Sequence, residues 1–126
     1  MTLIDKKTKL IYPKLSYEIT GVLFKVHNQL GRFCKEKQYQ DALMEAFEQR
    51  NFQFEREQEL RFSAKVGGNQ VDFVIENKIV LECKAKPFLT KNDYYQVLRY
   101  LKASGKRLGL LVNFRNRYLR PKRIVN

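Results

Sequence analysis

Apolar residues recur at helical spacing in the first part of the chain. One stripe lies within residues 16–30 and stops at Gly31, and a second lies within residues 36–50. Each stripe gives one apolar face, which is typical of a helix that packs against a sheet. We therefore expect two helices or one bent helix over residues 16–50, after a loose and mostly polar leader at residues 1–14. The stripes consist of Ile19, Val22, Leu23, Val26 and Leu30, and of Tyr39, Ala42, Leu43, Ala46 and Phe47.

Beyond residue 50 the pattern changes to short runs that are typical of strands. Loose alternation over residues 52–62 predicts a first strand ahead of a glycine turn at residues 67–68. Residues 70–76 (QVDFVIE) and 78–84 (KIVLECK) are β-rich and predict a hairpin. A later apolar run over residues 108–114 predicts another buried strand.

A third helix is predicted between the hairpin and this last strand. Thr90 and Asp93 form a capping box, and Gly105 is a typical residue just after a helix end. The order is then helix, three strands, helix and strand. With 126 residues, of which 44% are hydrophobic, the chain fits one α/β domain over residues 15–126. The stripe of this helix consists of Tyr94, Val97, Leu98 and Leu101.

Charged residues interrupt the apolar run of the second hairpin strand. Because strand side chains alternate, Glu82 and Lys84 share one face, and the other face takes the apolar residues. The position of Asp72 depends on the register. A loop of residues 76–77 places Asp72 on the face away from Glu82, whereas a loop of residues 76–78 pairs Asp72 with Glu82. Only the longer loop matches apolar with apolar throughout, by pairing Phe73 with Leu81, Val74 with Val80 and Ile75 with Ile79.

Two opposed carboxylates need a positive partner. At roughly 5 Å and an effective dielectric of about 20 they repel by about 3 kcal/mol, more than most cross-strand pairs contribute. The partner is either Lys84, two positions along on the same face, or a divalent cation. The first case describes a partly exposed cluster that Lys84 and water neutralise, and the second describes a metal site.

The formal charge of +12 comes from 25 Lys and Arg against 13 Asp and Glu. Every carboxylate side chain lies at or before Asp93, so the last part of the chain is purely basic. Such a field attracts polyanions, of which nucleic acid is the commonest in a cell. A merely solvated basic surface is the alternative.

Cysteine and histidine are scarce. Two cysteines and one histidine are too few for a structural zinc site. The sequence also shows no apolar N-terminal targeting run, so we expect a cytoplasmic protein with reduced thiols. We expect His27 to be structural and Cys83 to point to the apolar face of the sheet.

Three motifs resemble those of a known superfamily. Asp72, followed by Glu82-Cys83-Lys84 on the next strand, resembles the D…(D/E)xK signature of the PD-(D/E)XK nuclease superfamily. Gln96 and Tyr100 resemble the QxxxY motif that follows the catalytic hairpin in one branch of that superfamily.

A further segment is similar to a particular family of this superfamily. Residues 30–43 (LGRFCKEKQYQDAL) resemble the segment that names the GxxExxY family, with Glu36 and Tyr39 in the E and Y places and Phe33 in place of the second glycine. The runs GLLVNF and KRIVN also resemble that family, so the similarity extends over residues 15–126.

The resemblance implies a restriction-endonuclease-like αβββαβ core, with a mixed central sheet flanked by helices. It implies that Asp72, Glu82 and the carbonyl of Cys83 bind Mg²⁺ or Mn²⁺, that Lys84 positions the attacking water, and that Glu36 binds the metal directly or through water. The alternative for Glu36 is an ion pair with Lys37 or Arg32. Gln96 and Tyr100 would orient the water or the scissile phosphate; alternatively, Tyr100 is only a core residue and Gln96 is only solvated.

The function that follows is metal-dependent hydrolysis of nucleic acid, taken as DNA. Many nucleases of this fold cut as dimers, so a homodimer is compatible with the resemblance. The alternatives are a nucleic-acid-binding module that cleaves little or not at all, and a basic accessory protein that meets an acidic protein partner. The residues expected to hold phosphates are Lys102, Arg99, Arg115, Arg117 and Arg120.

Overall fold

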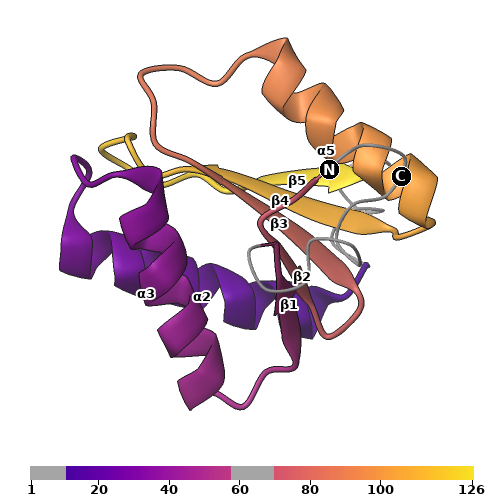
Figure 1. Ribbon diagram of the computed structural model, residues 1–126, viewed down its shortest axis with the longest axis horizontal. Coiled ribbons are helices and arrows are strands. Elements are labelled where there is room, and N and C mark those ends of the chain that lie inside the picture. The colour runs from indigo at the N-terminus through magenta and orange to yellow at the C-terminus, as the bar shows by residue number, and fades with distance from the viewer. Residues whose placement is uncertain (1–10, 58–69) are drawn as a thin grey trace.

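The computed structural model describes residues 11–57 and 70–126, which form three helices and a five-stranded sheet (Figure 1). Residues 1–10 of the expected leader lie outside the described residues. Ile11 is buried and the first helix begins at Pro13, so the last residues of that leader belong to the folded unit. The elements are α2 (Pro13–Leu30), α3 (Glu36–Gln49), β1 (Phe54–Arg56), β2 (Phe73–Ile75), β3 (Ile79–Lys84), α5 (Lys91–Ser104), β4 (Leu108–Asn113) and β5 (Lys122–Val125).

The sheet is mixed and follows the order β1-β2-β3-β4-β5. β3 and β4 are parallel, and every other neighbouring pair is antiparallel. The parallel step is made through α5, which crosses from the end of β3 to the start of β4 (Figure 1). The antiparallel pairing of β5 with β4 adds a fifth strand that the hydrophobic pattern did not predict.

The β2–β3 hairpin has the register of the longer predicted loop. Phe73 pairs with Leu81, Val74 with Val80 and Ile75 with Ile79. Glu76 and Asn77 take positive φ angles of 53° and 55°, which close the turn tightly. The matching of apolar residues across the strands was therefore a sufficient guide to the register.

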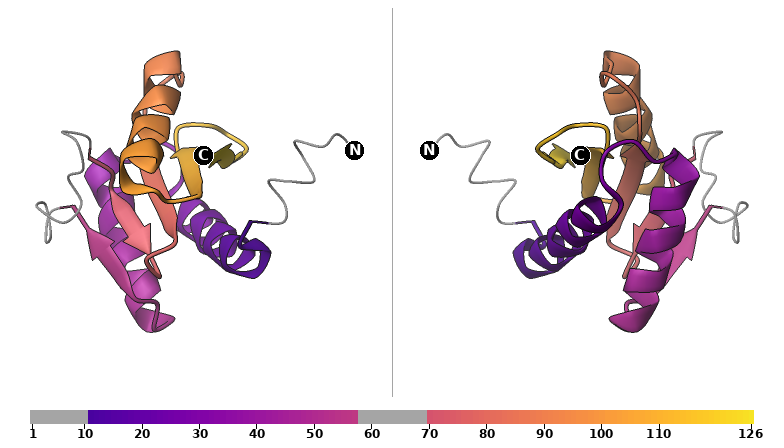
Figure 2. Two further views of the ribbon diagram at one scale, coloured as in Figure 1. Left: turned by 90° about the vertical axis from the view of Figure 1, so that its right-hand side faces the viewer. Right: turned by 90° about the vertical axis from the view of Figure 1, so that its left-hand side faces the viewer.

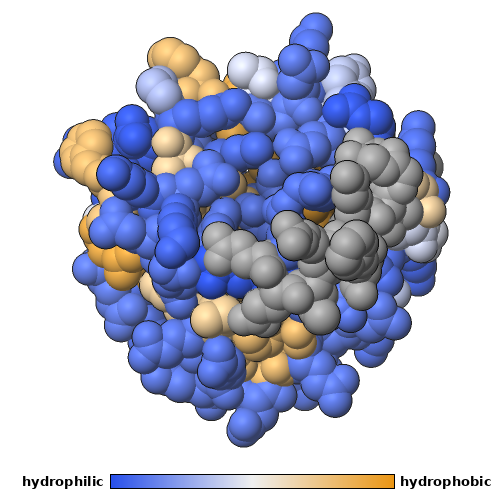
Figure 3. Space-filling model, viewed as in Figure 1, coloured by the Kyte–Doolittle hydropathy of each residue, from blue (hydrophilic) through white to orange (hydrophobic). Residues whose placement is uncertain are grey.

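Helices cover both faces of the sheet. α2 and α3 lie on one face and α5 lies on the other, as the two side views show (Figure 2). Ile79, Leu81 and Cys83 pack into the core under α2 and α3, whereas Val80 packs with α5. This confirms the predicted alternation along β3 and explains why even its charged residues are largely buried. The face seen in Figure 3 is mainly hydrophilic, with separate apolar patches.

Helix ends follow the predicted signals. The Thr90 side chain accepts a hydrogen bond from the backbone N–H of Asp93, and the N–H of Thr90 donates one to the Asp93 carboxylate. Gly105 ends α5 with a φ of 75°, and Gly31 ends α2 with a φ of 74°. The first helical region is therefore two helices.

Within the described residues, the first predicted strand is present as β1 (Phe54–Arg56). The rest of the predicted strand from residue 58 on, and the glycine turn at residues 67–68, lie outside the described residues. In the described part of the chain, no helix is both long and apolar enough to cross a bilayer.

Candidate active site

Two carboxylates of the hairpin lie beside each other on neighbouring strands. Asp72 directly precedes β2, and Glu82 lies on β3. Glu82 Oε1 accepts a hydrogen bond from the backbone N–H of Asp72 at 3.0 Å, and Asp72 Oδ2 accepts one from the N–H of Cys83 at 2.7 Å. Each side chain is thus bonded to the backbone of the opposite strand, and the pair links the two strands where the hairpin ends.

Burial forces this pair to hold a proton near neutral pH. Asp72 is only 8% exposed and Glu82 only 3%. Burial first, and then the charge of Glu82, raise the pKa of Asp72 to about 8. Burial also raises the pKa of Glu82, although Lys84 opposes that rise. Lys84 is bound to Glu82 and opposes the rise of its pKa, so burial favours the protonated form most strongly at Asp72.

Lys84 lies at the centre of the site. Its Nζ is 3.1 Å from Glu82 Oε2 and 3.8 Å from Asp93 Oδ1, and it donates a hydrogen bond to Gln96 Oε1 at 3.3 Å. Burial opposes the charge on Lys84, but Glu82 and the other nearby carboxylates outweigh it, so the pKa of Lys84 is raised. The ammonium group therefore stays charged and is the positive partner that the sequence required.

A family model described as the PD-(D/E)XK nuclease superfamily matches residues 13–124, which is nearly the whole chain. The chain belongs to this superfamily. The fold is accordingly restriction-endonuclease-like, as the mixed sheet and its flanking helices bear out. The superfamily consists in general of nucleases, so membership indicates a nuclease that acts on nucleic acid. No curated protein and no solved structure matches the chain.

The candidate site contains charged residues that the sequence did not predict. Asp93 was interpreted only as a cap, yet its Oδ2 also lies 2.6 Å from Nζ of Lys86. Burial would raise the pKa of Asp93, but the bonds from Lys86 and Thr90 outweigh it and lower the pKa. Strand alternation gave no signal for this contact, because β3 ends at Lys84 and Lys86 lies beyond it.

Glu57 is a second missed carboxylate. Its backbone N–H donates to the carbonyl of Asp72 at 3.1 Å, directly after β1. Burial raises the pKa of Glu57, and the charge of Lys84 opposes that rise, so this carboxylate lies within the field of the site. No sequence signal pointed to it, because the register of β1 against β2 is a tertiary feature.

The two residues of the QxxxY motif have different surroundings. Gln96 is held between Lys84 and the carbonyl of Gln70, to which its Nε2 donates at 3.1 Å. Tyr100 is 1% exposed and packs in the apolar cluster with Val97 and Leu101. The structure therefore brings Gln96 to Lys84, whereas Tyr100 has the surroundings of a core residue.

Glu36 is the first residue of α3. Its charge contributes to raising the pKa values of both Asp72 and Lys84, so it lies within electrostatic reach of the site. The partners proposed for an ordinary ion pair are engaged elsewhere. Lys37 pairs with Asp41 at 3.8 Å, and Arg32 Nε donates to a backbone carbonyl.

Tyr39 fixes the loop that precedes Glu36. Its buried hydroxyl donates to the carbonyl of Gly31 and accepts from the N–H of Cys34 at 3.2 Å. Its ring stacks on Phe114, with centroids 4.3 Å apart and planes 8° apart. Tyr39 therefore ties this loop to the residue after β4, which gives a physical role to the Y place of the GxxExxY-like segment.

The five basic residues expected to hold phosphates do not lie at one place. Arg115 is at the Lys84 end of β3, since its Nη2 donates to the carbonyl of Ala85 at 3.4 Å. Lys102 lies in the last turn of α5, near the opposite end of the sheet, where Lys106 Nζ donates to Asn77 Oδ1 of the hairpin turn at 3.0 Å. The remaining three are exposed, Arg99 on α5, and Arg117 and Arg120 in the β4–β5 connection.

The donor set suits a hard cation in its chemistry. Asp72 and Glu82 supply buried carboxylate oxygens, which Mg²⁺ and Mn²⁺ prefer, and a cation would favour the ionised form of both groups. As the side chains stand, no three His, Cys, Asp or Glu groups in residues 11–57 and 70–126 are close enough together to hold an ion.

His27 and the cysteines have structural surroundings. His27 Nε2 lies 2.9 Å from the carbonyl of Asn116. Cys83 is fully buried on the apolar face, as expected, and burial followed by the charges of Asp72 and Glu82 raises its thiol pKa well above the usual value. Cys34, which the sequence did not place, donates through Sγ to the carbonyl of Leu30 at 3.4 Å.

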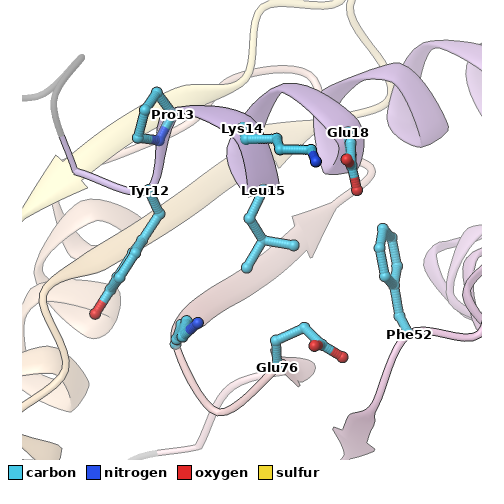
Figure 4. A pocket seen from close by; sticks show the side chains of 8 residues that line it. Tyr12, Pro13, Lys14, Leu15, Glu18, Phe52 and Glu76 are labelled. Carbon is cyan, nitrogen blue, oxygen red and sulfur yellow. The ribbon is translucent and has the colours of Figure 1, made fainter.

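A cavity of about 420 Å³ lies away from these residues, between the start of α2 and the hairpin turn (Figure 4). No residue of the predicted site lines it. Its walls combine apolar and charged side chains, and include Tyr12, Leu15, Glu18, Phe52 and Glu76.

Proposed function

We propose that the protein is a metal-dependent nuclease that hydrolyses phosphodiester bonds of DNA, and that within the superfamily it belongs to the GxxExxY family. The observation that carries the proposal is the buried pair of Asp72 and Glu82, with Lys84 bound to Glu82 on the same strand. Buried charges of this kind reduce stability unless they are fully compensated, so their presence on a core strand favours a catalytic role.

Asp72, Glu82 and the carbonyl of Cys83 would hold Mg²⁺ or Mn²⁺, and Glu36 would bind the same ion directly or through water. The bound ion would lower the pKa of a water molecule and neutralise charge on the phosphate. Asp72 must lose its proton first, which its pKa of about 8 makes easier at mildly alkaline pH.

Lys84 would position the attacking water through an N–H of its ammonium group and stabilise negative charge on the phosphate. Asp93 and Gln96 already hold Nζ of Lys84 from α5. Asp93 and Gln96 would keep the ammonium group in the site when Glu82 binds the metal ion. Tyr100, one turn beyond Gln96, would support Gln96 by fixing α5 on the sheet.

Basic residues around the site would bind flanking phosphates and make binding strongly dependent on salt. Arg115 is the nearest to Lys84, and Arg117 and Arg120 follow it in the same connection. Arg99 and Lys102 would meet a more distant part of the nucleic acid. For a duplex, a homodimer would supply one site for each strand, and the cytoplasm is the compartment that we propose.

A cleavage panel tests this function. Single-stranded, duplex and branched DNA and RNA are incubated with Mg²⁺ or Mn²⁺, using the wild type and the Lys84→Ala and Asp72→Asn variants. We expect cleavage by the wild type that EDTA abolishes and that both variants lose while remaining folded. Lys25→Ala, which changes an exposed lysine on α2, is the matched control. Undiminished cleavage by Lys84→Ala would refute the role of Lys84.

A non-cleaving nucleic-acid-binding module is the second candidate. It is favoured by the fact that Asp72 Oδ2 and both oxygens of Glu82 are engaged by protein groups. Salt-dependent binding without cleavage of any substrate in the panel would select this candidate.

A further inference from the structure

Phe33 is an exposed aromatic residue beside the candidate site. It lies in the loop that joins α2 and α3, and 76% of its surface is exposed. This loop and the β4–β5 connection lie side by side at the left of Figure 1, where Figure 3 shows isolated apolar residues on a hydrophilic surface. A single exposed aromatic residue is ordinary by itself, so its surroundings decide whether it has a role.

Two guanidinium groups lie against the ring. Cζ of Arg32 is 4.8 Å from the ring centroid of Phe33, and Cζ of Arg115 is 5.8 Å from it. Both distances are within the range of a cation–π interaction. The ring is thus bordered by positive charge while most of its surface remains open.

The two arginines are held in place by backbone carbonyls. Arg32 Nε donates to the carbonyl of Arg115 at 2.8 Å, and Arg115 Nε donates to that of Arg32 at 3.2 Å. Neither arginine pairs with a carboxylate in the part of the chain that the structure describes. Their charges are therefore fixed in position and available to an anion such as phosphate.

These three residues adjoin the end of β3 that carries Lys84. Arg115 Nη2 donates to the carbonyl of Ala85, the residue after Lys84, and the N–H of Phe114 donates to the carbonyl of Lys84 at 2.8 Å. Glu36 lies three positions after Phe33 along the chain. The ring therefore lies near the same end of β3 as Lys84.

We propose that Phe33, Arg32 and Arg115 form a stacking subsite for an unpaired base of a single-stranded nucleic acid. The subsite deepens the proposed nuclease function and rests on it for its biological purpose. A duplex keeps the faces of its bases stacked inside the helix, so an exposed ring gains a base only from a single strand or a flipped nucleotide. The arginines bind the phosphates next to that base.

The test measures binding without cleavage. Fluorescein-labelled oligo(dT) and a labelled blunt-ended DNA duplex are titrated with the full chain in EDTA, and fluorescence anisotropy gives the Kd for each. We expect the wild type to bind oligo(dT) more tightly than the duplex. Phe33→Ala should raise the Kd for oligo(dT) about ten-fold, because the stacking of one base on an aromatic ring strengthens binding by roughly that factor. It should leave duplex binding unchanged, and Phe33→Trp should restore oligo(dT) binding.

Phe24→Ala is the matched control, because Phe24 is an exposed phenylalanine on α2. Circular dichroism checks that each variant is folded. The subsite is refuted if Phe33→Ala binds oligo(dT) like the wild type, or if the substitution weakens duplex binding as much as oligo(dT) binding. Polyglutamate carries negative charge but has no bases. The subsite is also refuted if polyglutamate displaces oligo(dT) equally well from the wild type and from Phe33→Ala. Loss of oligo(dT) binding in Phe33→Ala, in a protein that cleaves nothing, would support the subsite while rejecting the nuclease. Cleavage with unchanged binding would do the opposite.

Discussion

Replacing Asp72 by asparagine should stabilise the metal-free protein at mildly alkaline pH while removing its activity. Burial and the charge of Glu82 raise the pKa of Asp72 from 3.8 to about 8 in the folded protein. Between these two values the folded state keeps a proton that the unfolded chain has released. The stability that Asp72 contributes is therefore fully present below about pH 4 and is lost as the pH rises through about 8.

The size of this effect follows from the same shift. Each pH unit in that interval reduces the free energy of unfolding by about 1.4 kcal/mol, and the slope levels off near the folded pKa. Between pH 6 and pH 8 the wild type should lose about 2 kcal/mol through this residue. Asparagine is neutral and keeps an oxygen for the N–H of Cys83, so Asp72→Asn should lack this loss.

Urea unfolding followed by circular dichroism, at pH 6, 7 and 8 in EDTA, measures the difference. Glu48→Gln, which neutralises an exposed carboxylate on α3, serves as the control and should follow the wild type. Added Mg²⁺ should remove part of the deficit of the wild type at pH 8, because it replaces the proton. Equal pH slopes for the wild type and Asp72→Asn would show that Asp72 ionises without cost, and would refute the reasoning.

Three further changes test the scaffold around the site by urea unfolding. Tyr39→Phe should cost about 1–2 kcal/mol, because it leaves two backbone groups without their hydroxyl partner; an unchanged stability would contradict the loop-fixing role. Gly109→Ala should cost about 1–3 kcal/mol, since its Cβ would come within 2.6 Å of Val97 Cγ1, and a neutral result would mean that α5 shifts freely on β4. Thr90→Ala should lower the free energy of unfolding by about 1 kcal/mol, because it removes the hydroxyl that accepts from the N–H of Asp93. Thr90→Ser keeps a hydroxyl and should retain most of the wild-type stability.

Local sequence signals predicted the helices and the hairpin well. The capping box at Thr90 and the glycines at 31 and 105 mark the observed helix ends, because each satisfies backbone groups within a few residues. The apolar matching between β2 and β3 gave the register, because a slip by one residue would turn every side chain to the wrong face. From that register the sequence alone brought Asp72 beside Glu82.

Two partners of Lys84 on α5, and a further carboxylate near it, could not be predicted from local signals. Asp93 and Gln96 reach Lys84 only because α5 packs back across the sheet, and Glu57 approaches only because β1 pairs with β2. The sequence determined the short-range geometry through hydrogen bonds and side-chain alternation, which depend on neighbouring residues. The tertiary structure decided which charges meet in the buried site, because that depends on the packing of elements distant along the chain.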